Sequence, residues 1–149
     1  MLSKFGIENF ELIKQSIHKF WGNNAVITNA KVIERPFDMF EIYLTINRRH
    51  NVLLSYDRSI VDISVQEKGE YVWLTDLTKE KVVEGFESCK QENLIHNFNI
   101  LNETLQEILF FARQQQRQLF LVVHNDLHIF SILGAWVKLL FIGIDVAEV

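Results

Sequence analysis

Apolar and polar residues alternate with a period of two between residues 25 and 75, and this pattern constrains the fold more than any other feature. The alternation is clearest in residues 39–46 and 61–65. A period of two predicts strands with one buried face. Turn-forming residues separate the runs, so we expect five short strands in an antiparallel meander. Their approximate limits are 25–34, 38–47, 51–56, 60–67 and 71–75.

Helical spacing of apolar residues predicts a helix on each side of this region. The first helix should end near Gly22 and carry its apolar residues on one face: Phe10, Ile13, Ile17, Phe20 and Trp21. Thr78 is a suitable N-cap for a second helix with an apolar stripe of Val82, Phe86 and Cys89. Glutamates would line the opposite side of that second helix.

A further helix, a strand and a last helix are expected in the C-terminal third. The spacing of Phe98, Leu101, Leu105, Ile108 and Ala112 predicts a helix that closes in the polar run 113–118. Residues 119–123 have the pattern of a buried strand, and Asn125 or Asp126 could cap a last helix that Gly143 ends. We therefore expect an α+β fold in one globular domain, 1–149. An N-terminal helix and a five-strand meander would precede helices and a small C-terminal β/α unit.

The composition indicates a packed globular protein of a reducing compartment. At 149 residues with 48 % apolar residues, the chain can bury a sizeable core. Its single cysteine excludes an internal disulfide, and no secretory pattern opens the sequence, so we expect a cytoplasmic protein. The longest apolar run, 129–144, is shorter than the roughly 20 residues of a membrane span and contains Lys138. No membrane association is expected.

The net charge of −4 is concentrated in residues 62–92, which we call the acidic segment. Eight of the 19 acidic residues lie there with only four of the 15 lysines and arginines, and the rest of the chain is balanced. A local field of one sign attracts partners of the opposite sign and speeds their association. The acidic balance disfavours nucleic acid as a direct ligand, because phosphate contacts need a basic surface. A basic protein is the partner that this charge favours.

Aromatic residues beside the acidic charges are candidate anchors for that partner. Tyr71 and Trp73 alternate with apolar residues, which is compatible with a place on the sheet face away from the core, where aromatic residues serve as anchors. A second packed layer that covers them is the alternative. The predicted partner-binding residues are Asp62, Glu67, Glu70, Tyr71, Trp73, Glu80, Glu84 and Glu87. A solvated helix face with no binding role remains an alternative for the glutamates.

Catalytic signatures are weak throughout. The sequence has no P-loop, no nucleophile elbow, no GxGxxG and no CxxC, and Cys89 has the position of a buried, inert thiol. His124, Asp126 and His128 are the only cluster of metal-type ligands, although a helix cap with incidental histidines explains them as well. Asp57 and Arg58 are explained by turn formation. We expect no cofactor, no metal and no catalytic residue, with a small metal-dependent hydrolase around the histidine cluster as the alternative.

Residues 52–65, VLLSYDRSIVDISV, in a small acidic α+β chain resemble bacterial immunity proteins, which neutralise a toxin domain. The resemblance covers about a third of the chain and transfers no functional residue. It implies a cytoplasmic protein that binds one toxin tightly, often by matching a basic nuclease surface with acids. The sequence thus predicts a protein-binding module and also permits a homodimer.

Overall fold

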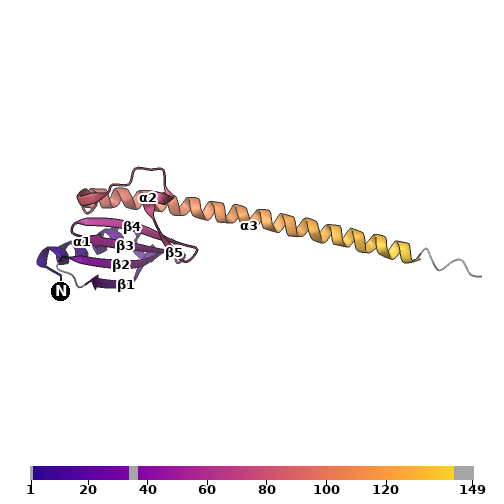
Figure 1. Ribbon diagram of the computed structural model, residues 1–149, viewed down its shortest axis with the longest axis horizontal. Coiled ribbons are helices and arrows are strands. Elements are labelled where there is room, and N and C mark those ends of the chain that lie inside the picture. Colours follow the sequence, from indigo (N-terminus) through magenta and orange to yellow (C-terminus); the bar gives the residue numbers. More distant parts are fainter. Residues whose placement is uncertain (1, 34–36, 143–149) are drawn as a thin grey trace, which may run out of the picture. The chain divides into compact units, whose positions relative to one another are not determined.

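The computed structural model describes residues 2–33 and 37–142, with the side chains of residue 116 and residues 118–142 outside that description. In order, the elements are a long helix, a 3-10 turn (Gly22–Asn24), a five-stranded sheet, two short helical turns and a second long helix (Figure 1). The chain divides into two compact units, Met1–Gln106 and Glu107–Val149. The sheet and the N-terminal helix belong to the first unit.

The sheet is an antiparallel meander with the strand order β1-β2-β3-β4-β5. Its strands are β1 (Ala25–Ile33), β2 (Met39–Ile46), β3 (His50–Asp57), β4 (Ile60–Glu67) and β5 (Glu70–Trp73). These bounds confirm the five predicted strands, each within one or two residues of its expected limits. The mixed α+β class, with a leading helix and later helices, is also confirmed.

Tight turns connect β2 to β3, β3 to β4 and β4 to β5, and each contains a residue other than glycine with positive φ. Arg58 and Ser59 join β3 to β4 with φ of 47° and 72°, and Lys68 and Gly69 join β4 to β5 with φ of 51° and 95°. Two central residues with positive φ make a type I′ turn, whose twist matches that of the flanking strands. The turns therefore set the register of β4 against both of its neighbours.

The core lies between one face of the sheet and two helices. On α1 (Lys4–Trp21), Phe10 meets Phe40 of β2 edge to face, with ring centroids 5.0 Å apart. On α3 (Gln91–Ile142), Phe98 lies 4.6 Å from Trp21, also between ring centroids. The fully buried residues come from both helices and from alternate strand positions, among them Ile13, Ile42, Leu44, Leu54, Leu94, Leu101 and Leu105. The period-two and helical patterns thus meet in one apolar layer.

The N-terminus of α1 is tied to the start of β2. The Ser3 hydroxyl accepts a hydrogen bond from the Gly6 amide and donates one to the Asp38 carboxylate, which also accepts from the Ser3 amide at 2.7 Å. These hydrogen bonds from Ser3 lower the pKa of Asp38. A Cβ on Gly6 would lie 2.6 Å from the Asp38 Cγ, so the close approach requires glycine at this position.

The predicted helix after Thr78 is wrong. A single turn, α2 (Leu74–Leu77), follows β5, residues 78–84 are not helical, and a 3-10 turn covers Gly85–Glu87. Thr78 accepts a hydrogen bond from the Glu80 amide, as in a local turn. Positive φ at Gly85 interrupts any helix there. Cys89 is buried as expected, but in the turn before α3.

The predicted strand at residues 119–123 is also wrong, because α3 runs through it without a break to Ile142. The expected helix start at Asn125 or Asp126 is helix interior, and the small C-terminal β/α unit does not form. A short apolar run fits a strand and a buried helix equally well by periodicity. No glycine or proline stands between residues 91 and 123 to stop the helix.

None of the helices, over the described residues, is long and apolar enough to cross a membrane.

Candidate partner-binding site

The eight predicted partner-binding residues fall into three places in the first unit. Asp62, Trp73 and Glu84 border one pocket; Glu67, Glu70 and Tyr71 surround the β4–β5 turn; Glu80 and Glu87 lie on exposed loops. The glutamates do not form a helix face, because residues 78–84 are not helical. Only Asp62, Trp73 and Glu84 are brought together, at the pocket that forms where this loop packs beside β4.

The pocket lies between β4 and the loop and has a volume of about 270 Å³. It forms because β5 pairs only with residues 64–67 of β4, so the first half of β4 has no strand partner on that side. The pocket is lined by Val61, Asp62, Ile63, Trp73, Leu74, Thr75, Val82, Val83 and Glu84. Its size is below the roughly 300–1,000 Å³ of typical small-molecule sites. The volume fits one long side chain better than a cofactor.

Ser88 closes the unpaired edge of β4 at one end of this region. Its hydroxyl accepts a hydrogen bond from the Val61 amide at 2.7 Å and donates one to the Gly85 carbonyl at 2.6 Å. Both Ser88 and Val61 are buried. Because a buried amide without a partner is costly, Ser88 stands in for the missing strand and holds the 3-10 turn against β4.

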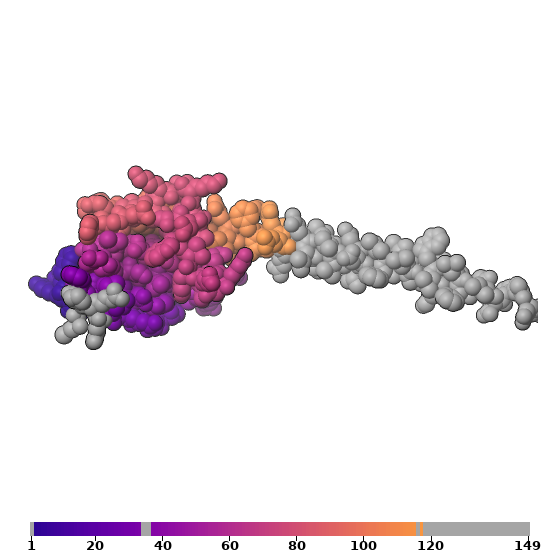
Figure 2. All heavy atoms as spheres, in the orientation of Figure 1, coloured from indigo at the N-terminus to yellow at the C-terminus, as the bar shows by residue number. Residues whose placement is uncertain are grey.

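Asn97 of α3 holds the other wall of the pocket. Its side-chain amide accepts a hydrogen bond from the Val83 amide and donates one to the Val83 carbonyl, both at 2.9 Å. The neighbouring His96 ring nitrogen lies 3.1 Å from the Lys81 carbonyl. Asn97 therefore pairs with the loop backbone as a neighbouring strand would, and it positions Val83 and Glu84. Figure 2 shows the loop in pink on the surface of the first unit.

The electrostatics of the pocket favour a cation. Burial raises the pKa of Asp62, and the negative charges of Glu84 and Asp57 raise it further. A positive group between Asp62 and Glu84 would reverse these unfavourable interactions. Glu87 contributes less free charge, because it forms an ion pair with Lys90 at 2.5 Å.

Trp73 supplies an aromatic wall beside these carboxylates. It ends β5, and 49 % of its surface is exposed. A tryptophan face attracts cations, and exposed tryptophans are the most frequent anchors of protein interfaces. Charge and aromatic surface therefore meet at one pocket.

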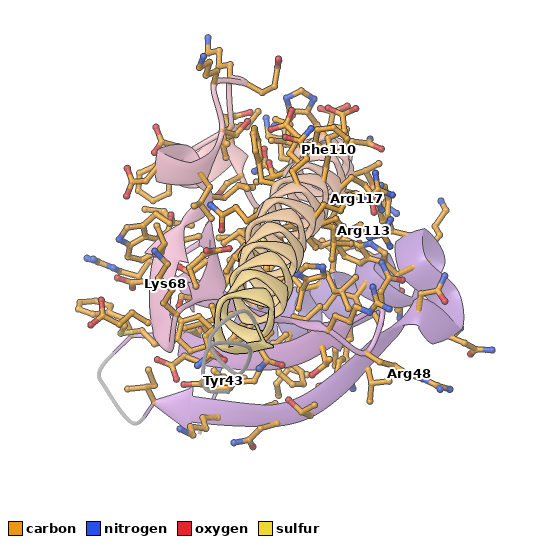
Figure 3. The ribbon with its side chains drawn as sticks, turned by 90° about the vertical axis from the view of Figure 1, so that its right-hand side faces the viewer. Tyr43, Arg48, Lys68, Phe110, Arg113 and Arg117 are labelled. Atoms are coloured by element: carbon orange, nitrogen blue, oxygen red, sulfur yellow. The ribbon has the colours of Figure 1, made fainter. Side chains whose placement is uncertain are left out.

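The turn between β4 and β5 holds a second acidic pair. Glu67 and Glu70 are directly opposite each other across the turn, and no ion pair to either is found among the described residues. Tyr71 leans toward Tyr43 of β2, with ring centroids 6.3 Å apart, and Figure 3 labels Tyr43 together with Lys68 of the turn. A hydrogen bond to Glu41 raises the pKa of Tyr43 to about 12. These residues are not part of the pocket lining.

The remaining candidates are the Asp57–Arg58 pair and the predicted metal cluster. Arg58 forms a two-pronged ion pair with the adjacent Asp57, at 2.9 and 3.1 Å, inside the tight turn. The described residues contain no group of three or more metal-type ligands. The side chains of the candidate metal cluster lie outside the described residues: His124, Asp126 and His128.

Sequence reasoning missed the residues that build the pocket. Ser88 and Asn97 have no motif, since a serine before a helix and an asparagine within one have many ordinary roles. The only available signal was a polar residue at position 97, between Leu94 and Phe98 on an apolar helix face. A buried asparagine at such a position must satisfy its amide, and here it does so on the loop.

Comparisons of the chain with protein-family models, with curated proteins and with solved structures found no match. The residues and contacts of the pocket are therefore the basis for assigning its function.

Proposed function

We propose that this chain is a protein-binding module that captures a basic partner protein, as an immunity-type inhibitor of a toxin or nuclease would. The observation that carries the proposal is the pocket, which brings Asp62, Glu84 and Trp73 together at an open strand edge. A lysine or arginine side chain of the partner would enter it. Its charged end would lie between the two carboxylates and its stem against the indole.

The fixed walls of the pocket support binding. The side chain of Asn97 holds Val83 on one side, and Ser88 holds the 3-10 turn against β4 on the other. A site that is already formed loses little conformational entropy when a partner binds. The acidic pair Glu67 and Glu70 would add long-range attraction that salt weakens.

The charge of Asp62 does not stabilise the fold, which favours a role for this residue in binding. Its raised pKa means that the fold disfavours its charged form. Asp62→Asn should therefore leave stability at neutral pH unchanged or slightly higher, while it weakens binding of a basic partner. A loss of stability in this variant would instead indicate a structural role for the carboxylate.

The proposal can be tested by capture from a lysate of the native host with immobilised wild-type chain and two variants. Asp62→Asn combined with Glu84→Gln removes the two pocket charges, and Glu103→Gln combined with Glu107→Gln removes two exposed carboxylates of α3 as the matched control. A basic protein should be retained by the wild type and the control at low salt, and lost from the pocket variant. Equal retention by all three chains, or no basic protein at all, would contradict the proposal.

Kinetics with the purified partner would then separate steering from pocket contacts. Charge removal at Glu67 and Glu70 should slow association and reduce its salt dependence, whereas Trp73→Ala should mainly speed dissociation. An inhibitor of a toxin should also abolish the catalytic activity of that partner at equimolar concentration.

A further inference from the structure

The first strand of the sheet has an open edge along its whole length. Among the described residues, β1 pairs only with β2, and Figure 1 draws no strand beyond it. Its side chains are uncovered on both faces, with 56 % of Val26, 37 % of Ile27 and 47 % of Val32 exposed. Along this nine-residue edge strand, the backbone N–H and C=O groups that point away from β2 have no strand partner among the described residues. Together with the exposed aliphatic side chains, they form a template for another strand.

The protection of the β1 edge is limited to one charged residue and one bulge. Natural edges carry charges, prolines or bulges that prevent pairing with other chains. β1 has no proline, and its only charged residue is Lys31, whose ammonium lies 4.9 Å from the centre of the Tyr43 ring. The strand has one bulge, between Ile27 and Asn29.

The bulge makes β1 self-complementary. Ala25 and Ile27 before it, and Ala30 and Val32 after it, are paired with buried residues of β2 and so share the core-side face. Two antiparallel copies of β1, related by a two-fold axis between residues 28 and 29, place Ala25 opposite Val32 and Ile27 opposite Ala30. Apolar residues then face apolar residues, and Lys31 faces Val26 instead of a second Lys31.

We propose that β1 is the interface between two copies of this chain, which pair their first strands antiparallel into one continuous ten-stranded sheet. The register described above pairs almost the full length of the strand and places no like charges opposite each other. The edge of β1 is therefore complementary to the same edge of a second copy of the chain. The pocket is bordered by β4 and the loop after it, so the interface leaves it free.

Sedimentation of the full chain over a range of concentrations tests the proposal. Val32→Lys puts a charge on the core-side stripe of β1, and Ile7→Lys is its control, because Ile7 is 48 % exposed on α1. The dissociation constant of the dimer should rise about tenfold or more in Val32→Lys relative to Ile7→Lys, a change of about 1.4 kcal/mol. Urea unfolding of both variants verifies that each is folded.

Thiol cross-linking tests the register. A mixture of Ala25→Cys and Val32→Cys chains should cross-link with a short bifunctional reagent, whereas either variant alone should not, because each of these residues lies far from its own copy across the two-fold axis. The unmodified chain controls for Cys89, which is buried. A wild-type chain that stays monomeric at all concentrations would overturn the proposal. A dimer that Val32→Lys weakens no more than Ile7→Lys does would also overturn it, since another surface would then carry the association.

Discussion

Replacement of Asn97 by aspartate tests how the pocket loop is held. Asparagine and aspartate have nearly the same shape, but an ionised carboxylate only accepts hydrogen bonds. The bond from the Val83 amide would survive in Asn97→Asp, while the bond to the Val83 carbonyl would be replaced by two oxygens in contact. Asn97 is 1 % exposed, so water cannot relieve this repulsion.

The expected cost follows from these contacts. One lost hydrogen bond costs about 0.5–1.5 kcal/mol, and an unsatisfied buried group adds about 1–3 kcal/mol, or more when it is charged. Asn97→Asp should thus lose about 2–4 kcal/mol at neutral pH. With a urea dependence of about 2 kcal/mol per molar, a typical slope for a small protein, the unfolding midpoint should fall by about 1–2 M. Far-UV circular dichroism and tryptophan fluorescence would follow the transition.

The cost of Asn97→Asp should also depend on pH, with a predictable sign. Burial raises the pKa of the new carboxyl group above its unfolded value of about 3.9. The cost is therefore complete above the raised pKa and shrinks as pH falls toward 3.9, because a protonated carboxyl can donate to the Val83 carbonyl again.

Asn99→Asp is the matched control, since Asn99 is exposed on the same helix and bonds only to the Ile95 carbonyl. It should change stability by no more than about 0.5 kcal/mol. Equal urea midpoints for the two variants would refute the inference that the hydrogen bonds of Asn97 to Val83 hold the loop in place. A difference between the midpoints that does not change with pH would refute it as well.

Three further substitutions test the fold around the site, each by its urea midpoint. Ser88→Ala should lose about 1–3 kcal/mol, because the buried Val61 amide is left without its acceptor; an unchanged midpoint would show that another group replaces Ser88. Gly6→Ala should destabilise α1 because the new Cβ meets the Asp38 carboxylate, yet in an Asp38→Ala background it should stabilise by about 1 kcal/mol, as alanine normally does in a helix. If Gly6→Ala stabilises in both backgrounds, the close contact is absent. Leu101→Ala should lose about 2–5 kcal/mol as a fully buried core residue, and a loss below about 1 kcal/mol would place it outside the core.

The sheet was predictable because its pattern is local. Alternation in residues 39–46 specifies which side chains face the core, and the turn residues at 57–59 and 68–69 lie where the structure has type I′ turns. Each strand could be recognised from its own residues without knowledge of its neighbours.

The loop after Thr78 could not be predicted in the same way. Val82, Phe86 and Cys89 have helical spacing, so the local pattern favours a helix there. Asn97, 14 residues further along, instead bonds both backbone groups of Val83, and such a contact is visible only after α3 has packed on the sheet. Tertiary hydrogen bonds overrode a weak local preference.

The candidate site shows the same division. The sequence alone shows that negative charge is concentrated in the acidic segment. It also shows that Tyr71 and Trp73 lie among these charges. Which of these residues share a surface was decided by β5 being too short to cover β4, which leaves the pocket where Asp62, Trp73 and Glu84 meet.

The sequence by itself determined the elements whose patterns are periodic: the first helix, the five strands and their order along the chain. The tertiary structure alone decided the path of the loop, the extent of α3 through residues 119–123, and the grouping of charges into a pocket. The physical reason is the distance along the sequence over which each interaction acts. Periodicity reports which face of an element is buried, whereas hydrogen bonds such as that from the Val61 amide to Ser88 join residues 27 positions apart and leave no periodic trace.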